Sequence, residues 1–260
     1  MLNSLLKIAG VYKIYEKYLS NQISKAEAPK HIGIILDGNR RWAVAHSYPR
    51  LIGHLFGAKK AEKLLEWCNE MDIKTITLYV LSVENLQRSS DEVKELLSLI
   101  EEKFKDLMQD ERIHKHHIRV KALGKIELLP DSMKEILSKI EKATEDYDEH
   151  FLNIAIAYGG RLEIVDVVKR IAEKAKHGEI DPSQINPKII EDHLYTSHLP
   201  YPEPDLIIRT SGEERLSGFL LWQSAYSELV FLDVFWPEFR KIDLMRAVRT
   251  YQRRKRRFGK

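Results

Sequence analysis

Short apolar runs alternate with longer segments of helical periodicity along the chain. The apolar runs are rich in isoleucine, leucine and valine and are short enough to be strands. Six of them are expected to form strands, at residues 31–36, 75–81, 118–123, 152–157, 206–208 and 229–234. Strands that alternate with helices along a chain are typical of a mainly parallel sheet covered by helices. The sequence therefore predicts an open α/β fold with a six-stranded, mainly parallel sheet.

Two of the intervening segments have an apolar face at helical spacing. One helix is expected after residues 89–92 (Ser-Ser-Asp-Glu), which have the pattern of a capping box, and another from about His54 to Met71. The inward-facing residues are expected to be Val93, Leu96, Leu97, Ile100, Phe104, Leu107 and Met108 in the first helix, and Ala58, Ala61, Leu64, Leu65 and Cys68 in the second.

The segment after the first predicted strand carries candidate chemistry. In open α/β sheets ligands bind beyond the carboxyl ends of the strands, where residues 34–43 read Ile-Ile-Leu-Asp-Gly-Asn-Arg-Arg-Trp-Ala. Asp37 offers a carboxylate to a cation, and the backbone amides after Gly38 can bind an anion. Asp-Gly is also ordinary turn chemistry. Four potential phosphate-binding side chains follow closely, however, at Arg40, Arg41, Arg50 and His54. The segment therefore predicts half of a magnesium and diphosphate site.

A second polar cluster follows the fifth strand, at residues 209–217 (Arg-Thr-Ser-Gly-Glu-Glu-Arg-Leu-Ser). Arg209 and Arg215, with hydroxyl groups between them, could bind the oxygens of one diphosphate. The alternative is surface ion pairing with the two glutamates of the same segment. Glu228 precedes a run that should be largely buried, so its carboxylate needs a partner, for which a metal ion is one candidate.

Several other site types are excluded because their motifs are absent. The segment 53–60 has the wrong spacing for the G-x-x-x-x-G-K-[ST] motif of P-loop NTPases, and neither G-x-G-x-x-G nor D-D-x-x-D occurs.

Two further polar segments also follow predicted strands, at residues 82–88 (Ser-Val-Glu-Asn-Leu-Gln-Arg) and 158–161 (Tyr-Gly-Gly-Arg). Alone they indicate no particular chemistry.

Composition limits the class of protein. The chain has 260 residues, of which 43% are hydrophobic and 31% charged, and no apolar run is long enough to span a membrane. Its single cysteine, Cys68, excludes an internal disulfide and a multi-cysteine metal centre. Glycine and proline are thinly spread, so no linker divides the main domain. Lysines interrupt the N-terminal segment, so no secretory signal is predicted and a cytoplasmic location is expected.

Both ends of the chain have a distinct pattern. Residues 1–26 are expected to be an amphipathic helical extension of a single domain at 27–260, although Gly10 weakens the helix. Its apolar stripe either packs on protein or docks on a membrane with its lysines toward anionic lipid. Residues 249–260 include seven basic residues and no acidic one, which suits phosphate, anionic lipid, RNA or a solvated helix end. The net charge of +3 is too small to imply a nucleic-acid partner.

The polar segments, in this order and spacing, resemble the cis-prenyltransferase family over Pro29 to Gly259. The segments that carry the resemblance are 31–43, 82–88, 158–161 and 205–228. It implies a central parallel sheet, a hydrophobic tunnel that the two helix faces could wall, and a homodimer. It also implies Mg²⁺-dependent condensation of isopentenyl diphosphate onto farnesyl or geranylgeranyl diphosphate. The product would be a long-chain polyprenyl diphosphate, the precursor of a glycan carrier lipid.

The resemblance also implies roles for residues at matching positions. Asp37 would be the essential acid and would bind Mg²⁺ with Glu228. Asn85 would orient the path of the leaving proton toward a diphosphate oxygen or Asp37, since an amide is a poor base. The allylic substrate would be bound by Gly38, Asn39, Arg40, Arg41, Arg50 and His54, with Trp42 at the entrance. Isopentenyl diphosphate would be bound by Arg209, Arg215, Leu216 and Ser217, and the reacting carbons would be surrounded by Ser82, Val83, Glu84, Leu86 and Arg88.

Three features depart from the bacterial pattern of the family. Arg40 stands where bacterial members usually have glycine, Leu86 stands where they usually have tryptophan, and the N-terminal extension precedes the usual start. Arginine at the first position favours an archaeal-type enzyme. Arg257-Phe258-Gly259 resembles an Arg-x-Gly ending that reaches across the dimer in some members. Two alternatives remain open: a noncatalytic regulatory subunit, and a Mg²⁺-dependent phosphotransferase using Asp37.

Overall fold

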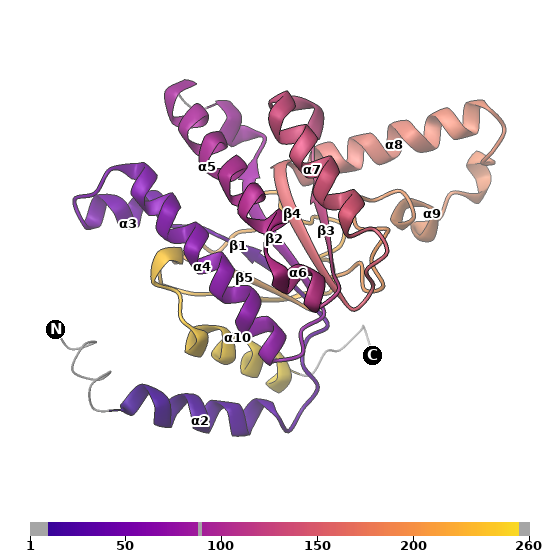
Figure 1. Cartoon of the computed structure of the whole chain (residues 1–260). Helices are drawn as coiled ribbons and strands as arrows, with labels where there is room; N and C mark the ends of the chain where they lie inside the picture. Colours follow the sequence, from indigo (N-terminus) through magenta and orange to yellow (C-terminus); the bar gives the residue numbers. More distant parts are fainter. Residues whose placement is uncertain (1–9, 88–89, 255–260) are drawn as a thin grey trace.

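The centre of the fold is a six-stranded sheet in which neighbouring strands are parallel (Figure 1). It is seen in a computed structural model that describes residues 10–87 and 90–254. The strand order is β3-β4-β2-β1-β5-β6. The strands are β1 (His31–Ile35), β2 (Thr75–Ser82), β3 (Ile118–Leu123), β4 (His150–Tyr158), β5 (Leu206–Arg209) and β6 (Glu228–Phe231). The predicted fold class and six strands are therefore confirmed, with boundaries that differ by up to three residues.

Alternate residues of a strand point to opposite faces of the sheet, and here both faces carry apolar side chains that must be covered. Ile32 and Ile34 of β1 belong to an apolar cluster with residues of five α-helices, whereas Ile35 packs on the other face with Phe219 and Leu220. The α-helices are α2 (Val11–Ile23), α3 (Asn39–Ala45), α4 (Arg50–Glu70), α5 (Ser90–Met108), α6 (Glu111–Lys115), α7 (Asp131–Ala143), α8 (Gly160–Lys176), α9 (Pro187–Glu191) and α10 (Lys241–Arg253). The helices of the first cluster are α4, α5, α6, α7 and α10.

The two helices predicted from apolar faces are present, with small corrections. The second of them, α4, begins at Arg50 rather than near His54, because Pro49 occupies its N-cap with a fixed backbone angle suited to a helix start. In α5, Met108 is exposed rather than inward, since it is the last residue of the helix. No helix in the described ranges is long and apolar enough to cross a membrane.

The described part of the N-terminal extension is helical and lies beside α10 (Figure 1). Its helix α2 begins after Gly10, whose φ of 69° favours glycine. Leu19 is buried against α10 in a small apolar cluster. On the adjacent side of the helix Val11, Ile14 and Tyr18 are exposed. The stripe therefore packs on the body of the same chain but leaves an apolar edge uncovered.

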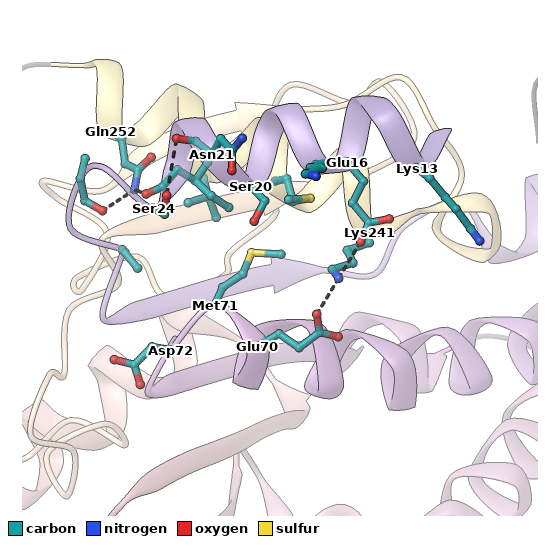
Figure 2. A pocket seen from close by; sticks show the side chains of 16 residues that line it. Lys13, Glu16, Ser20, Asn21, Ser24, Glu70, Met71, Asp72, Lys241 and Gln252 are labelled. Carbon is teal, nitrogen blue, oxygen red and sulfur yellow. Dashed lines mark hydrogen bonds and ion pairs between the residues drawn. The ribbon is translucent and has the colours of Figure 1, made fainter. Parts of the chain in front are cut away.

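An open groove of about 670 Å³ lies between α2, the end of α4 and α10 (Figure 2). Lys241 of α10 crosses it and forms ion pairs with Glu16 of α2 at 2.7 Å and Glu70 of α4 at 2.5 Å. Gln252 donates hydrogen bonds to the carbonyls of Ile23 and Ala26, both at 2.9 Å. These polar contacts fix α2 on the body at both ends of the groove.

A buried polar network joins the first strands at the amino ends of the sheet. The Nδ1–H of His31 donates to the carbonyl of Tyr201 at 2.8 Å, and its Nε2 accepts from the Thr77 hydroxyl at 2.8 Å. The proton must be on Nδ1, because the Tyr201 carbonyl can only accept a hydrogen bond. Burial lowers the pKa of His31 to about 4, so the imidazole is neutral in the folded protein near neutral pH.

Candidate active site

Asp37 lies two residues after the last residue of β1, at the carboxyl end of the sheet. Its Oδ2 accepts a hydrogen bond from Arg209 Nη2 at 2.7 Å, and its Oδ1 contacts Arg41 Nη2 at 3.3 Å. Burial opposes ionisation, but the two guanidinium groups outweigh it and hold the pKa of the Asp37 carboxyl below its usual range. The carboxylate is therefore charged at neutral pH and can serve as a ligand for a cation.

The turn after Asp37 requires glycine. Gly38 has φ of 102°, and a Cβ there would lie 2.7 Å from the Phe235 ring and 3.0 Å from Ser211. Thr210 fixes the same turn, because its hydroxyl donates to the Asp37 carbonyl at 2.7 Å and accepts from the Asp37 amide at 3.1 Å. The end of β1 is thereby joined to the end of its neighbour β5, which brings Asp37 and Arg209 together.

Arg209 and Arg215 occupy different environments. The Arg209 side chain is only 5% exposed, and its Nη1 donates to Ser217 Oγ at 2.7 Å and to the Arg215 carbonyl at 2.5 Å. The Arg215 side chain is 63% exposed and forms an ion pair with Glu213, which also pairs with Arg41 at 3.0 Å. Surface ion pairing, one of the two sequence interpretations, thus holds for Arg215 and not for Arg209.

Two further arginines converge on a single carboxylate of α5. Arg40 of α3 and Arg50 of α4 each lie 3.3 Å from Glu92. Ser82, at the end of β2, accepts a hydrogen bond from the Asn85 amide at 3.2 Å and donates its own amide to Asn85 Oδ1 at 3.5 Å. These contacts place the predicted residues of α3, α4 and the 82–87 segment around the carboxyl end of the sheet.

A cavity of about 970 Å³, which we call the mouth, is lined by most of the predicted site residues. The predicted residues in its lining are Asp37, Gly38, Asn39, Arg40, Arg41, Arg50, His54, Ser82, Glu84, Asn85, Arg209, Arg215 and Ser217. Val83 and Leu86 pack against the main apolar cluster instead, and Leu216 packs against the cluster on the other face. Arg88, Arg257 and Gly259 lie outside the described residues.

Trp42 does not line the mouth, contrary to the role that the resemblance implies. It is 7% exposed, and its ring packs against His46 at 4.6 Å and Phe56 at 4.9 Å between ring centroids. The cause is the close crossing of α3 and α4, since a Cβ on Gly53 would lie 2.1 Å from the Asn39 carbonyl oxygen. The segment 53–60, which lacks the P-loop spacing, thus allows α4 to pack closely against α3.

Glu228 is not brought to Asp37 within the chain. It begins β6 opposite Leu206, and Leu206 pairs with Ile32, five residues before Asp37. At about 3.3 Å per residue the separation along the sheet is on the order of 15 Å. The partner of Glu228 is Arg254, at 2.9 Å. A role for Glu228 at the same metal ion as Asp37 therefore has no support in the geometry of one chain.

A second cavity of about 410 Å³, which we call the apolar cavity, lies between α4, α5, β2 and β4. It shares Leu36, Asn39, His54, Val80 and Leu96 with the mouth, so the two cavities lie next to each other. The predicted helix faces supply its walls. They contribute Ala58, Ala61 and Leu65 from α4, and Leu96, Ile100, Phe104 and Leu107 from α5.

Some residues of the site were not predicted from the sequence. Tyr79 lines the mouth, and its hydroxyl donates to the Ser217 carbonyl at 3.2 Å. Its ring stacks on Phe219 at 4.9 Å, and Gly33 of β1 leaves the space that Phe219 fills. Glu92, which contacts Arg40 and Arg50, has only the pattern of a capping box in the sequence. A tyrosine within an apolar run carries no signal of its own, because such residues are ordinary in buried strands.

The donor set at the mouth fits a divalent cation such as Mg²⁺ when a diphosphate is present. Mg²⁺ is commonly bound by one or two carboxylates together with substrate phosphates. Asp37 provides one such carboxylate. No group of three or more histidine, cysteine, aspartate or glutamate side chains that could hold a metal ion alone occurs in the described part of the chain. Residues from a single chain would thus need substrate oxygens to complete a cation site.

Comparison with known proteins gives consistent results. Residues 35–259 match a prenyltransferase family model described as undecaprenyl diphosphate synthase. The chain is similar to tritrans,polycis-undecaprenyl-diphosphate synthase (geranylgeranyl-diphosphate specific) of Methanocaldococcus jannaschii, with 53% identity over 97% of this chain and 90% of the relative. The Methanopyrus kandleri protein of the same name is 51% identical over 98% and 93%. Among solved structures, lavandulyl diphosphate synthase from Lavandula x intermedia, in complex with dimethylallyl diphosphate, is 33% identical, with a TM-score of 0.86 over 90% of this chain and 99% of that chain.

Proposed function

The chain belongs to the undecaprenyl diphosphate synthase family of cis-prenyltransferases, and from this premise we propose that it extends geranylgeranyl diphosphate with isopentenyl diphosphate. Cis-prenyl chain elongation itself follows from the family and from relatives about half identical over nearly the whole chain. The preference for geranylgeranyl diphosphate over farnesyl diphosphate rests on the names of those relatives. The product would be a long-chain polyprenyl diphosphate that serves as the precursor of a glycan carrier lipid.

One observation supports this proposal above the others, namely that an apolar cavity lies directly beside a charged mouth and shares five lining residues with it. A prenyl diphosphate has an anionic head and a hydrocarbon tail. Arg41 and Arg209 at the mouth suit the head, and the walls formed by α4 and α5 suit the tail, which gains by leaving water. A phosphotransferase acting on a polar acceptor would have no use for such a cavity.

The residues of the mouth account for the chemistry required. Cleavage of the allylic C–O bond leaves negative charge on a diphosphate, and preformed positive groups lower the barrier most when they meet that charge as it develops. We assign the allylic diphosphate to the side lined by Gly38, Arg40, Arg41, Arg50 and His54, and the isopentenyl diphosphate to Arg209 and Ser217. Mg²⁺ would be held by Asp37 with substrate oxygens and would add further charge stabilisation.

Proton removal completes each condensation, as a proton leaves C2 of the isopentenyl unit after the new bond forms at the allylic C1. Asn85 is held by Ser82 at the mouth and would orient the path of that proton. Asp37 is a weak base, because Arg209 and Arg41 lower its pKa. We therefore assign the proton to a diphosphate oxygen.

Assembly and location are also part of the proposal. We place residues 27–260 in a catalytic domain that forms a homodimer, for which the exposed Val165 and Val168 of α8 offer an apolar surface. Residues 1–26 would form an extension whose exposed Ile14 and Tyr18 make peripheral contact with a membrane from the cytoplasmic side. Light scattering of the purified protein tests the dimer, and sedimentation with anionic vesicles, with and without residues 1–26, tests the membrane contact.

One assay distinguishes the proposed function from its alternatives. The purified protein is incubated with geranylgeranyl diphosphate, radiolabelled isopentenyl diphosphate and Mg²⁺, and the extracted lipid is sized. Long-chain product supports the proposal. Release of phosphate without a longer lipid would favour a phosphotransferase, and the absence of both reactions would favour a noncatalytic subunit. Asp37, Arg209 and Ser217, which are all present, argue against that last possibility.

A further inference from the structure

Exposed apolar side chains gather where α3 turns into α4, in a region that we call the α3–α4 tip (residues 44–56). In Figure 1 this tip protrudes at the left of the molecule, on the opposite side of the picture from α8. Val44, Tyr48 and Phe56 are exposed there. The half-buried apolar residues in the first turns of α4 are Leu51, Ile52 and Leu55.

Aromatic contacts join the exposed residues of the tip into one surface. The buried ring of Trp42 lies 5.9 Å from the Tyr48 ring and 4.9 Å from the Phe56 ring, measured between centroids. His46 packs on the same indole at 4.6 Å. Single exposed apolar residues are ordinary on a protein surface, but a contiguous patch marks a place where the protein contacts another apolar surface.

Unpaired cations lie along the edge of this patch. Lys59 and Lys63 follow it on the next turns of α4, and both are exposed. Within residues 10–87 and 90–254 neither lysine pairs with a carboxylate, and the ammonium of Lys59 lies 6.0 Å from the centre of the Phe56 ring. Glu62 and Glu66 of the same stretch are paired with cations of α5 and α6. An apolar patch bordered by unpaired lysines is complementary to an anionic lipid surface.

The tip borders the mouth and lies on the same side of the molecule as the start of α2. Val44 and Ala45 of the tip also line the mouth. In Figure 1 the tip and the start of α2 both lie at the left edge of the molecule, so one flat surface could contact both. The exposed Val11 and Ile14 of α2 belong to that end of the helix. A membrane on this side would therefore meet the entrance of the candidate active site.

We propose that the α3–α4 tip docks on an anionic membrane surface and thereby places the mouth at the lipid. The inference goes beyond the proposed function but uses it, because a prenyl diphosphate has a hydrocarbon tail that is costly to expose to water during transfer. Tyr48 suits the interface, since its ring is apolar and its hydroxyl can stay in contact with water. Docking itself does not depend on the reaction and can be measured without substrate.

The experiment measures sedimentation of the full-length protein with vesicles of phosphatidylcholine and phosphatidylglycerol, and with vesicles of phosphatidylcholine alone. The tip variant is Val44→Ser/Tyr48→Ser, at side chains 65% and 50% exposed. Its matched control is Leu128→Ser/Ile185→Ser, at apolar side chains 55% and 42% exposed elsewhere on the surface. We expect the tip variant to bind anionic vesicles roughly tenfold more weakly than wild type, and the control to stay within about twofold.

A second variant tests the charges of the same surface. Lys59→Gln/Lys63→Gln should also weaken binding to the anionic vesicles roughly tenfold, without changing binding to phosphatidylcholine alone, because the attraction of lysine to anionic lipid is electrostatic. Added salt should reduce the difference between this variant and wild type. This variant decides the question if the serine variant does not keep the thermal stability of the wild type.

Other outcomes would overturn the docking proposal in recognisable ways. If wild type does not bind anionic vesicles, or if both tip variants bind as wild type does, the tip is not a membrane contact. In the second case, loss of binding on deletion of residues 1–26 would assign the contact to the N-terminal extension alone. If Val44→Ser/Tyr48→Ser converts a dimer to a monomer in light scattering without vesicles, the tip is an interface between copies of the chain.

The polyprenyl assay separates failure of this inference from failure of the proposed function. Long-chain product from a protein whose tip variants bind vesicles as wild type does would refute the docking alone. Binding that depends on the tip, in a protein that makes no polyprenyl product, would refute the proposed function and leave the docking surface in place.

Discussion

Separate replacement of Arg209 and Arg215 by alanine tests how the mouth binds a diphosphate. Both arginines follow β5 in the same polar segment, and sequence alone gives them the same role. The structure separates them, because Arg209 is almost completely buried between Asp37 and Ser217, whereas Arg215 is largely exposed beside Glu213. We therefore expect different losses of affinity for isopentenyl diphosphate.

The magnitudes follow from these environments. A hydrogen bond to a charged group in a buried site is worth about 1.5 to 3 kcal/mol, so Arg209→Ala should raise the KM for isopentenyl diphosphate roughly 10- to 150-fold. An exposed charge contact is worth about 1 kcal/mol or less, so Arg215→Ala should raise it by about fivefold or less. Arg209→Lys keeps the charge beside Asp37 but not the forked donors, and we expect an intermediate value.

The assay is steady-state kinetics in which each substrate is varied in turn at saturating concentration of the other. The increase in KM should appear for isopentenyl diphosphate and not for geranylgeranyl diphosphate. Equal effects of the two alanine variants would refute the argument from burial. A rise confined to the KM of geranylgeranyl diphosphate would show that the two diphosphate sites have been assigned the wrong way round.

Four further predictions concern single groups. Asp37→Asn should lower turnover by about 100- to 1,000-fold or more with little change in thermal stability, and more than about a tenth of wild-type kcat would contradict the role of the carboxylate. EDTA should abolish product formation and added Mg²⁺ should restore it. Full activity in EDTA would show that the reaction does not require a divalent cation. Tyr79→Phe removes the hydroxyl that contacts the Ser217 carbonyl and should raise the KM for isopentenyl diphosphate a few-fold at nearly constant kcat; an effect on kcat alone would contradict this positioning role. The pKa of His31 is lowered to about 4 in the folded protein, so the unfolded chain binds the proton more tightly as the pH falls below about 6.5. Protonation of this group should therefore lower the free energy of unfolding by about 3 kcal/mol at about pH 4. Urea unfolding of His31→Gln should lack that part of the pH dependence.

The strands and the location of the site could be predicted from the sequence for a physical reason. A strand buried on both faces of a parallel sheet needs a nearly continuous apolar run, and such runs are visible in a single sequence. Loops at the carboxyl ends of such strands must carry the polar chemistry. Asp37 and Arg209 were therefore found by position as well as by type. Their contact could not be predicted, because it depends on β1 lying beside β5 across more than 170 residues of chain.

The roles expected for Glu228 and Trp42 rested on other arguments, namely the family resemblance and, for Glu228, its expected burial. Glu228 is the first residue of β6 and lies opposite the first residue of β5, so it stands at the amino ends of the strands, away from the edge where ligands are expected. Trp42 directly follows Arg41, which reaches the mouth, yet successive residues of a helix point in different directions. Only the crossing of α3 with α4 decides that Trp42 points into the body.

The arginines of the mouth bear on how an anionic substrate binds. Those described there already contact carboxylates: Arg209 and Arg41 contact Asp37, Arg40 and Arg50 contact Glu92, and Arg215 contacts Glu213. Binding of a diphosphate must therefore exchange one set of ion pairs for another. Such an exchange gains little unless the released carboxylates find new partners, since an uncompensated charge in a partly buried site is costly. Of these carboxylates, Asp37 has the most buried arginine partner, so a cation that arrives with the diphosphate compensates the charge where compensation is needed most.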